Sequence, residues 1–202
     1  MDFAERLSLW LNAFDAIRLQ SAHQALRGMR AAAAGARPAV AASAVADITH
    51  EVQRVREALA TAIAYEPVAL RVGDAADATY TPYRQRHQEL QRQMDQRIGA
   101  LREKARQTLA RASPRLRQLA VLDAVLEQGL AAREHALLPT ASTLIERRFE
   151  QLRHSQAQDD AGAWLEGFRR DWRQALMAEL DLRMQPVAGL IDALRNESTN
   201  QQ

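Results

Sequence analysis

The residues of this sequence that are most able to do chemistry are basic. Residues 82–117 carry ten Arg or Lys side chains and three Asp or Glu, which is a local charge of +7 in a chain of net charge +2. A helix of this charge can lie against nucleic-acid phosphates, where counterion release supplies affinity. It can also pair with acidic helices of the same chain or of a partner. A third interpretation is a solvent-exposed helix face, because arginine is common throughout the chain and Lys104 is the only lysine.

Composition weighs against the nucleic-acid interpretation. Tyr83 is the only aromatic residue within 82–117, so there are few rings on which bases could stack. The sequence shows neither zinc-finger spacing nor a basic-zipper pattern, and a net charge of +2 does not indicate a polyanionic partner. All three interpretations stay open, with nucleic acid the least favoured.

The histidines do not form a recognisable metal or catalytic pattern. None of them makes the two-histidine, one-turn spacing of a helical zinc site. His87 falls on an apolar stripe, where a histidine at the edge of the core is expected. No glycine-rich phosphate loop or nucleophile elbow is present, and the absence of cysteine excludes disulfides and thiolate chemistry. We therefore predict a protein that is not an enzyme and that uses no catalytic residue, cofactor or metal. The five histidines are His23, His50, His87, His135 and His154.

The elements that carry these residues should all be helical. The chain is rich in Ala, Leu, Arg, Glu and Gln, which favour helix, and only 5% of its residues are aromatic. Apolar residues three or four apart predict a first helix to about residue 30 and a second helix after Asp47. Between them, residues 31–46 read as an Ala-rich linker, and Pro67, Gly73 and Pro82 mark an irregular loop at 67–81.

Three longer helices should follow the loop. Thr81-Pro82 and Ser113-Pro114 are strong helix starts, which predicts helices over 82–112 and 114–154, with a kink or an end at Pro139. A last helix is expected over 162–195. The predicted fold is all-α, an antiparallel bundle of five or six helices. Its predicted parts are an N-terminal helical segment (1–66), the loop (67–81), a long-helix bundle (82–195) and a disordered tail (196–202).

The helix at 82–112 is also the predicted interaction element. Its apolar stripe suits helix-on-helix packing, either within the chain or against a partner, and its arginines could meet an acidic partner. The residues proposed for packing are Leu90, Met94, Ile98 and Leu101, and those proposed for an acidic partner are Arg84, Arg92 and Arg102.

Four stretches of the chain resemble a proteobacterial helical domain family of unknown function. They are "FAERLSLWLNAFDAIRLQSAH", "YTPYRQRHQELQRQMDQRIGALRE", "ASPRLRQLAVLDAVLEQGLAAREHALL" and "AELDLRMQPVAGLIDALR". The resemblance implies no residue roles. It implies a genomic setting beside a coiled-coil membrane protein and an OmpA/MotB-type peptidoglycan-binding protein, as in a cell-envelope or motor-like assembly.

Together these observations predict a non-catalytic helical scaffold or interaction subunit. Its expected partner is a protein with a helical or coiled-coil region, or a second copy of the chain. The alternative is a nucleic-acid-binding protein acting through the basic helix 82–117. The N-terminus lacks the features of a secretory signal, and no stretch approaches the roughly 20 apolar residues of a membrane-spanning helix. A cytoplasmic protein that does not insert into the membrane is expected.

Overall fold

The computed structural model describes Gln20, Gln24 and residues 42–65, 78–155 and 163–199, with residue 42 and residues 130–141 described by their backbone alone. Within this part of the chain every residue is helical except residues 65, 78–80 and 113, and no strand occurs. The prediction of an all-α fold is confirmed. Apart from Gln20 and Gln24, the predicted first helix lies outside the described residues, as do the linker up to residue 41 and residues 67–77 of the predicted loop.

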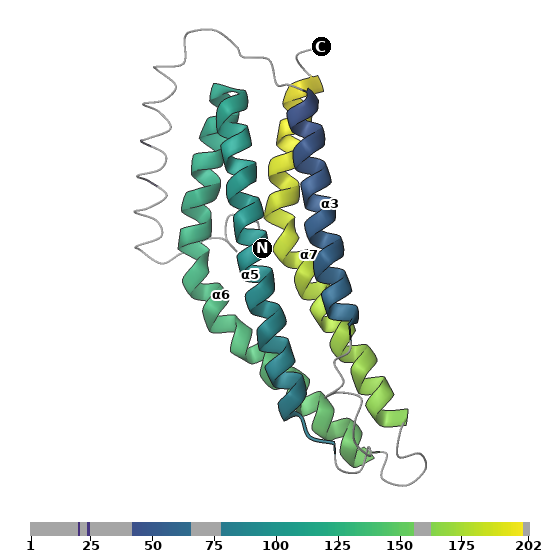
Figure 1. The fold of residues 1–202 in the computed structure, drawn as a ribbon. Helices are drawn as coiled ribbons and strands as arrows, with labels where there is room; N and C mark the ends of the chain where they lie inside the picture. Colours follow the sequence, from purple (N-terminus) through teal and green to yellow (C-terminus); the bar gives the residue numbers. More distant parts are fainter. Residues whose placement is uncertain (1–19, 21–23, 25–41, 66–77, 156–162, 200–202) are drawn as a thin grey trace. The chain divides into compact units, whose positions relative to one another are not determined.

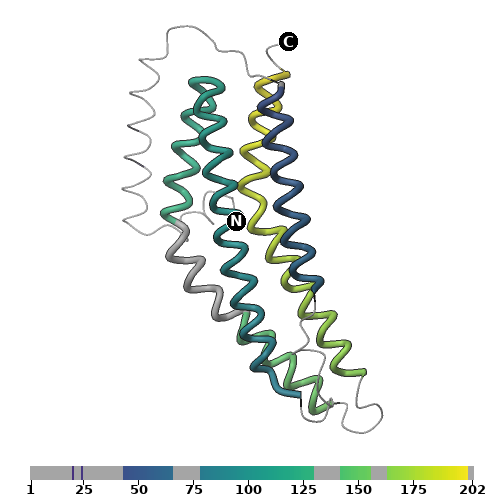
Figure 2. Tube along the Cα trace, viewed as in Figure 1, coloured from purple at the N-terminus to yellow at the C-terminus, as the bar shows by residue number. Residues whose placement is uncertain are grey.

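The helices labelled in Figure 1 are long. α5 coincides with the predicted helix to within one residue, and Figure 2 traces the same helices along their Cα atoms. The break between α5 and α6 follows from local chemistry, because Ser113 Oγ accepts a hydrogen bond from the Leu116 backbone N–H at 3.2 Å. The helices are α3 (Ala42–Ala64), α5 (Thr81–Ala112), α6 (Pro114–Ser155) and α7 (Ala163–Thr199).

Two predicted boundaries are wrong, the start of α3 and the start of the C-terminal tail. α3 begins at Ala42 instead of after Asp47, because the alanines that read as a linker are also the strongest helix formers. α6 runs from Pro114 to Ser155, which confirms the predicted helix over 114–154 to within one residue, and of the two outcomes left open at Pro139 the helix does not end there. A proline inside a helix costs one backbone hydrogen bond and about 3 kcal/mol. Residues packed on both sides of it, such as Leu116 and Phe149, hold the helix in place.

The predicted tail is also partly helical, since α7 extends to Thr199. The hydroxyl groups of Ser198 and Thr199 both donate to the Arg195 carbonyl oxygen, at 2.8 and 3.1 Å. These side-chain bonds supplement the backbone hydrogen bonds at the end of the helix. Residues 196–199 therefore belong to the helix.

Contacts divide the chain into two compact units. Unit 1 comprises Met1–Thr49, Arg102–His135 and Pro186–Gln202, and unit 2 comprises His50–Leu101 and Ala136–Gln185. The helices α3, α5, α6 and α7 each contribute residues to both.

The core of unit 2 contains a cluster of aromatic rings. Phe149 of α6 is fully buried and lies edge-on to Phe168 of α7, with ring centroids 4.9 Å apart. Tyr83 of α5 makes a similar contact with Phe168 at 5.0 Å, and Trp164 reaches Phe149 at 5.3 Å. Edge-to-face pairs contribute beyond the burial of their area, so this cluster joins three helices within unit 2.

The core of unit 1 is aliphatic. Its buried residues include Leu109 of α5, Leu116 of α6 and Leu194 of α7, each at most 3% exposed. The small side chains of Ala105 and Ala120 are also buried in this unit. Burial of such stripes is the main stabilising contribution to helices of this kind.

Candidate functional site

The basic stretch 82–117 forms α5 and the first turn of α6, and much of its charge is paired inside the chain. In unit 2, Arg84 Nη2 lies 3.0 Å from Glu146 Oε1 of α6. Arg86, whose side chain is 12% exposed, donates from Nη2 to the carbonyl oxygen of Ala62 in α3 at 2.9 Å. These arginines therefore link α5 to neighbouring helices.

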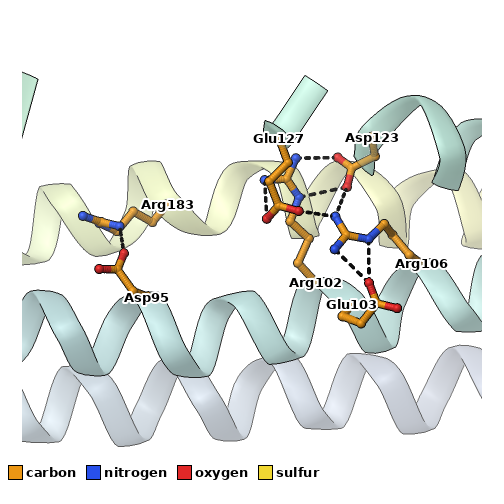
Figure 3. Close-up of polar contacts among 7 residues, drawn as sticks. All are labelled: Asp95, Arg102, Glu103, Arg106, Asp123, Glu127 and Arg183. Carbon is orange, nitrogen blue, oxygen red and sulfur yellow. Dashed lines mark hydrogen bonds and ion pairs between the residues drawn. The ribbon is translucent and has the colours of Figure 1, made fainter. Parts of the chain in front are cut away.

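Unit 1 contains a larger ionic network between α5 and α6, shown in Figure 3. Arg102 donates from Nε and Nη2 to the two carboxylate oxygens of Asp123, at 2.8 and 2.7 Å. Arg106 donates from Nη1 to Asp123 Oδ2 at 3.1 Å and to Glu127, and from Nε to Glu103 at 3.0 Å. The Asp123 side chain is 11% exposed. This geometry gives planar, bidentate pairing, which is among the strongest polar contacts in proteins.

The network favours the charged form of Arg106. Burial acts to lower the pKa of Arg106, but its hydrogen bonds to Glu127, Glu103 and Asp123 outweigh burial and raise that pKa above its usual range. Hydrogen bonds from Gln107 and Arg106 lower the pKa of the exposed Glu103 carboxyl. The charged form of each group is therefore favoured. Groups held in this way stabilise a helix pair and are poor proton donors or acceptors.

Unit 2 has a polar layer on α5 and α7, one turn beyond the aromatic cluster. Glu179 accepts hydrogen bonds from Gln91 Nε2 at 3.1 Å and from Arg183 Nε at 2.9 Å. Arg183 also donates to Asp95, a pair visible in Figure 3. His87 lies in the same layer, with Nε2 3.7 Å from Glu179 Oε2. The layer brings one histidine, two acids and one arginine together.

His87 is the most unusual member of this layer. Its side chain is 2% exposed, and neither ring nitrogen has a hydrogen-bond partner among the described residues. Burial lowers the pKa of His87; Glu179 acts to raise that pKa and Arg183 to lower it. The imidazole is therefore held in its neutral form at pH 7. It was expected at the edge of the core, and the structure places it inside the core.

A shallow crevice opens on unit 2 where α3, α5 and α7 meet. It has room for a group about the size of one water molecule, which is too small for an organic substrate. Two of its lining residues, Arg169 and Arg173, lie one turn apart on α7. The crevice is lined by Ile63, Tyr65, Tyr83, Arg169, Trp172 and Arg173.

The residues predicted for interaction are divided between the core and the surface. Leu90 and Met94 are fully buried, and Ile98 and Leu101 are 6% and 3% exposed. A partner cannot reach these four side chains while α5 stays packed. Arg84 and Arg102 pair with acids of the chain itself, as described above. Arg92 is exposed and makes no hydrogen bond or ion pair within the described residues.

The sequence analysis did not identify the acidic residues that pair with the arginines of α5 and α7. Asp123 and Glu127 are four residues apart on α6, so they lie on one face of that helix and form a paired acceptor. Glu179 and Arg183 have the same spacing on α7 and bond to each other. The spacing could have identified both pairs as helix-face pairs, although it carries no information about their partners on other helices.

The fold and these sites define a class: an all-α protein in which several buried or half-buried arginines pair with carboxylates on a neighbouring helix. Among the described residues, no group of three or more His, Asp or Glu side chains is arranged to hold a metal ion. In the same part of the chain, no helix is long and apolar enough to cross a membrane.

The chain belongs to the family described as "Protein of unknown function (DUF3348)", whose model matches residues 1–196. The family is uncharacterised and assigns no role to any residue. No curated protein and no solved structure matches the chain.

Proposed function

We propose that this protein is a non-catalytic helical scaffold that binds another protein. The observation that carries the proposal is the use of its ionisable residues: Arg102, Arg106 and Arg183 all pair with carboxylates on a neighbouring helix. Such pairs hold long helices in register and consume the groups that acid–base catalysis would need.

The length of the helices also supports this proposal. α5, α6 and α7 have 32, 42 and 37 residues, against an average of about 11–12 in globular proteins. Long helices present extended polar faces, which suit contact with another elongated helical protein. On the resemblance noted above, we propose a coiled-coil segment of a neighbouring membrane protein as the partner. The chain would then be a cytoplasmic accessory subunit of a cell-envelope or motor-like assembly.

The experiment is size-exclusion chromatography with light scattering, on the protein alone and mixed with the cytoplasmic coil of the membrane protein encoded next to it. The proposal expects a peak whose mass is the sum of the two partners. Two unchanged peaks, with no self-association of the protein alone, would reject the scaffold proposal.

Arg92 allows a matched test of where the partner binds. Arg92 and Arg97 are both exposed on α5, and five residues rotate a helix by about 140°, so they point in different directions. Arg92→Gln should weaken the complex about five-fold if an acidic coil lies on this face, whereas Arg97→Gln should leave the dissociation constant within about two-fold. Equal effects of both variants would indicate a general charge effect instead of a defined face.

A further inference from the structure

The crevice of unit 2 carries an excess of positive charge. Arg169 is held in place, since it donates from Nε to Tyr83 Oη at 3.0 Å and from Nη1 to Glu166 Oε1 at 2.6 Å. Arg173, one turn further along α7, makes no hydrogen bond or ion pair within the described residues. No described residue occupies the donors of its guanidinium group, which can therefore bind a group that enters the crevice.

The end of α3 explains why positive charge gathers at the crevice, but it does not account for Arg173. α3 ends at Ala64, and the carbonyl end of a helix carries partial negative charge that attracts cations. Arg86 uses this attraction directly, because it bonds the carbonyl oxygen of Ala62. Arg173 makes no such bond to the described residues. A further negatively charged group would pair with the guanidinium group of Arg173.

The walls of the crevice define what that group can be. The space admits about one water-sized group, which matches a single carboxylate oxygen and excludes a larger ligand body. Tyr65 is 59% exposed, and its ring offers an apolar surface next to the cations. Trp172 is 4% exposed, and no described residue accepts a hydrogen bond from its indole Nε1–H. An arginine beside aromatic rings is a common composition at the centre of protein interfaces.

We propose that this crevice binds the carboxylate of an Asp or Glu side chain on the partner protein, with Arg173 as the main donor. The proposal rests on the proposed function and gives the chemistry of one contact: an acidic side chain that projects from the partner. The guanidinium group of Arg173 makes a charge-assisted pair with it. Arg169 contributes positive charge without giving up its bond to Tyr83.

The test is a nuclear magnetic resonance titration of protein labelled with ¹⁵N at its three tryptophans, Trp10, Trp164 and Trp172. The indole N–H signal of Trp172 is assigned with the variant Trp172→Phe. The probes are a short peptide of alternating Glu and Gly with blocked termini, the matching Gln peptide, and inorganic phosphate, all at constant ionic strength. We expect the Glu peptide to move the Trp172 signal to saturation and the Gln peptide to leave it in place.

Two substitutions on α7 provide the controls. Arg173→Gln should weaken binding of the Glu peptide about ten-fold, which corresponds to the loss of one charge-assisted contact, and Arg173→Lys should give an intermediate affinity. Arg170 is exposed and does not line the crevice, so Arg170→Gln should change the affinity less than about two-fold. Far-ultraviolet circular dichroism checks that each variant remains helical.

Three results would overturn this inference. They are an unsaturated or absent shift of the Trp172 signal, equal binding of the Gln peptide or of phosphate, and equal effects of Arg173→Gln and Arg170→Gln. The chromatography experiment with the neighbouring coil does not depend on these outcomes. If a complex forms there while the peptide fails here, the scaffold proposal stands and the crevice is not the contact.

Discussion

Arg102 and Asp123 form a two-pronged pair, in which Nε and Nη2 of the guanidinium group each donate to a different carboxylate oxygen, at 2.8 and 2.7 Å. The side chains are 15% and 11% exposed, so the pair is largely shielded from water. It joins α5 to α6 within unit 1 and shares its carboxylate with Arg106. Arg102 and Arg106 of the basic helix are therefore balanced by acidic residues of the chain itself.

This pair should contribute measurably to stability. We expect Asp123→Asn to lower the free energy of unfolding by about 2 kcal/mol, because it removes the acceptor charge from two poorly hydrated arginines. Urea denaturation of the purified protein measures the change. The matched control is Asp192→Asn. The Asp192 side chain pairs with Arg195 and is 67% exposed, so this substitution should lower the free energy of unfolding by less than about 0.5 kcal/mol. Equal losses in the two variants would contradict the structural role of the network.

The aromatic cluster should be the most sensitive part of unit 2. Phe149 is fully buried and contacts the rings of Tyr80, Trp164 and Phe168. Phe149→Ala should lower the free energy of unfolding by about 3–5 kcal/mol and weaken the near-ultraviolet circular dichroism of these rings. Leu144→Ala, at a side chain 58% exposed on the same helix, should cost less than about 0.5 kcal/mol. A loss below about 1 kcal/mol for Phe149→Ala would show that the cluster is not packed as described.

His87 makes stability depend on pH in a defined direction. Burial holds the folded-state pKa of His87 below its unfolded value of 6.5, so below pH 6.5 the unfolded chain takes up a proton that the folded chain does not. Stability therefore falls as the pH drops through 6.5 towards the lowered pKa, by at most about 1.4 kcal/mol per pH unit from this one group. Unfolding of the wild type in urea at pH 7.5 and pH 5.5 measures the loss.

The substitution His87→Leu removes this proton uptake and fills a similar volume. The variant should lose less stability than the wild type between the two pH values, and it should be at least as stable at pH 5.5, because it leaves no unpaired ring nitrogens in the core. His154→Gln, at a side chain 73% exposed, is the control and should keep the wild-type pH dependence. An unchanged pH dependence in His87→Leu would show that His87 is not the group that makes stability depend on pH.

A stabilising substitution is expected at Gly189. This glycine is exposed within α7, and a Cβ atom added there would meet nothing within 4 Å. Alanine restricts the unfolded chain and favours helix, so Gly189→Ala should raise the free energy of unfolding by about 0.5–1 kcal/mol. The midpoint of thermal unfolding should rise by about 2 °C for a chain of this size. A decrease in the midpoint would mean that another surface occupies the space beside Gly189.

The sequence is sufficient to predict features that depend on neighbouring residues. The three-and-four spacing of Leu90, Met94 and Leu101 indicates a packing face, and all three are buried. Ser113-Pro114 predicts the break between two helices because a hydroxyl cap and a proline act locally. Helix ends set by weaker signals, such as Ala42 and Thr199, are predicted less well.

The pairing of charges could not be predicted in the same way. Arg102 and Asp123 are 21 residues apart, and Asp95 and Arg183 are 88 residues apart. Which acid meets which arginine depends on the register and rotation of helices against each other, and periodicity does not specify these. The sequence alone therefore does not show that Arg84 and Arg102 have acidic partners on α6.

Arg84, Arg86, Arg102 and Arg106 of the basic stretch pair with carboxylates of the chain itself, and we propose that the protein binds another helical protein. The most direct test compares two partners for one purified sample: a DNA duplex, and the coil of the neighbouring membrane protein, each at about 50 and 200 mM salt. The account predicts a complex with the coil at both salt concentrations and no retention on DNA at about 10 µM protein. Binding to DNA at 50 mM salt that is lost by 200 mM, without a complex with the coil, would contradict it.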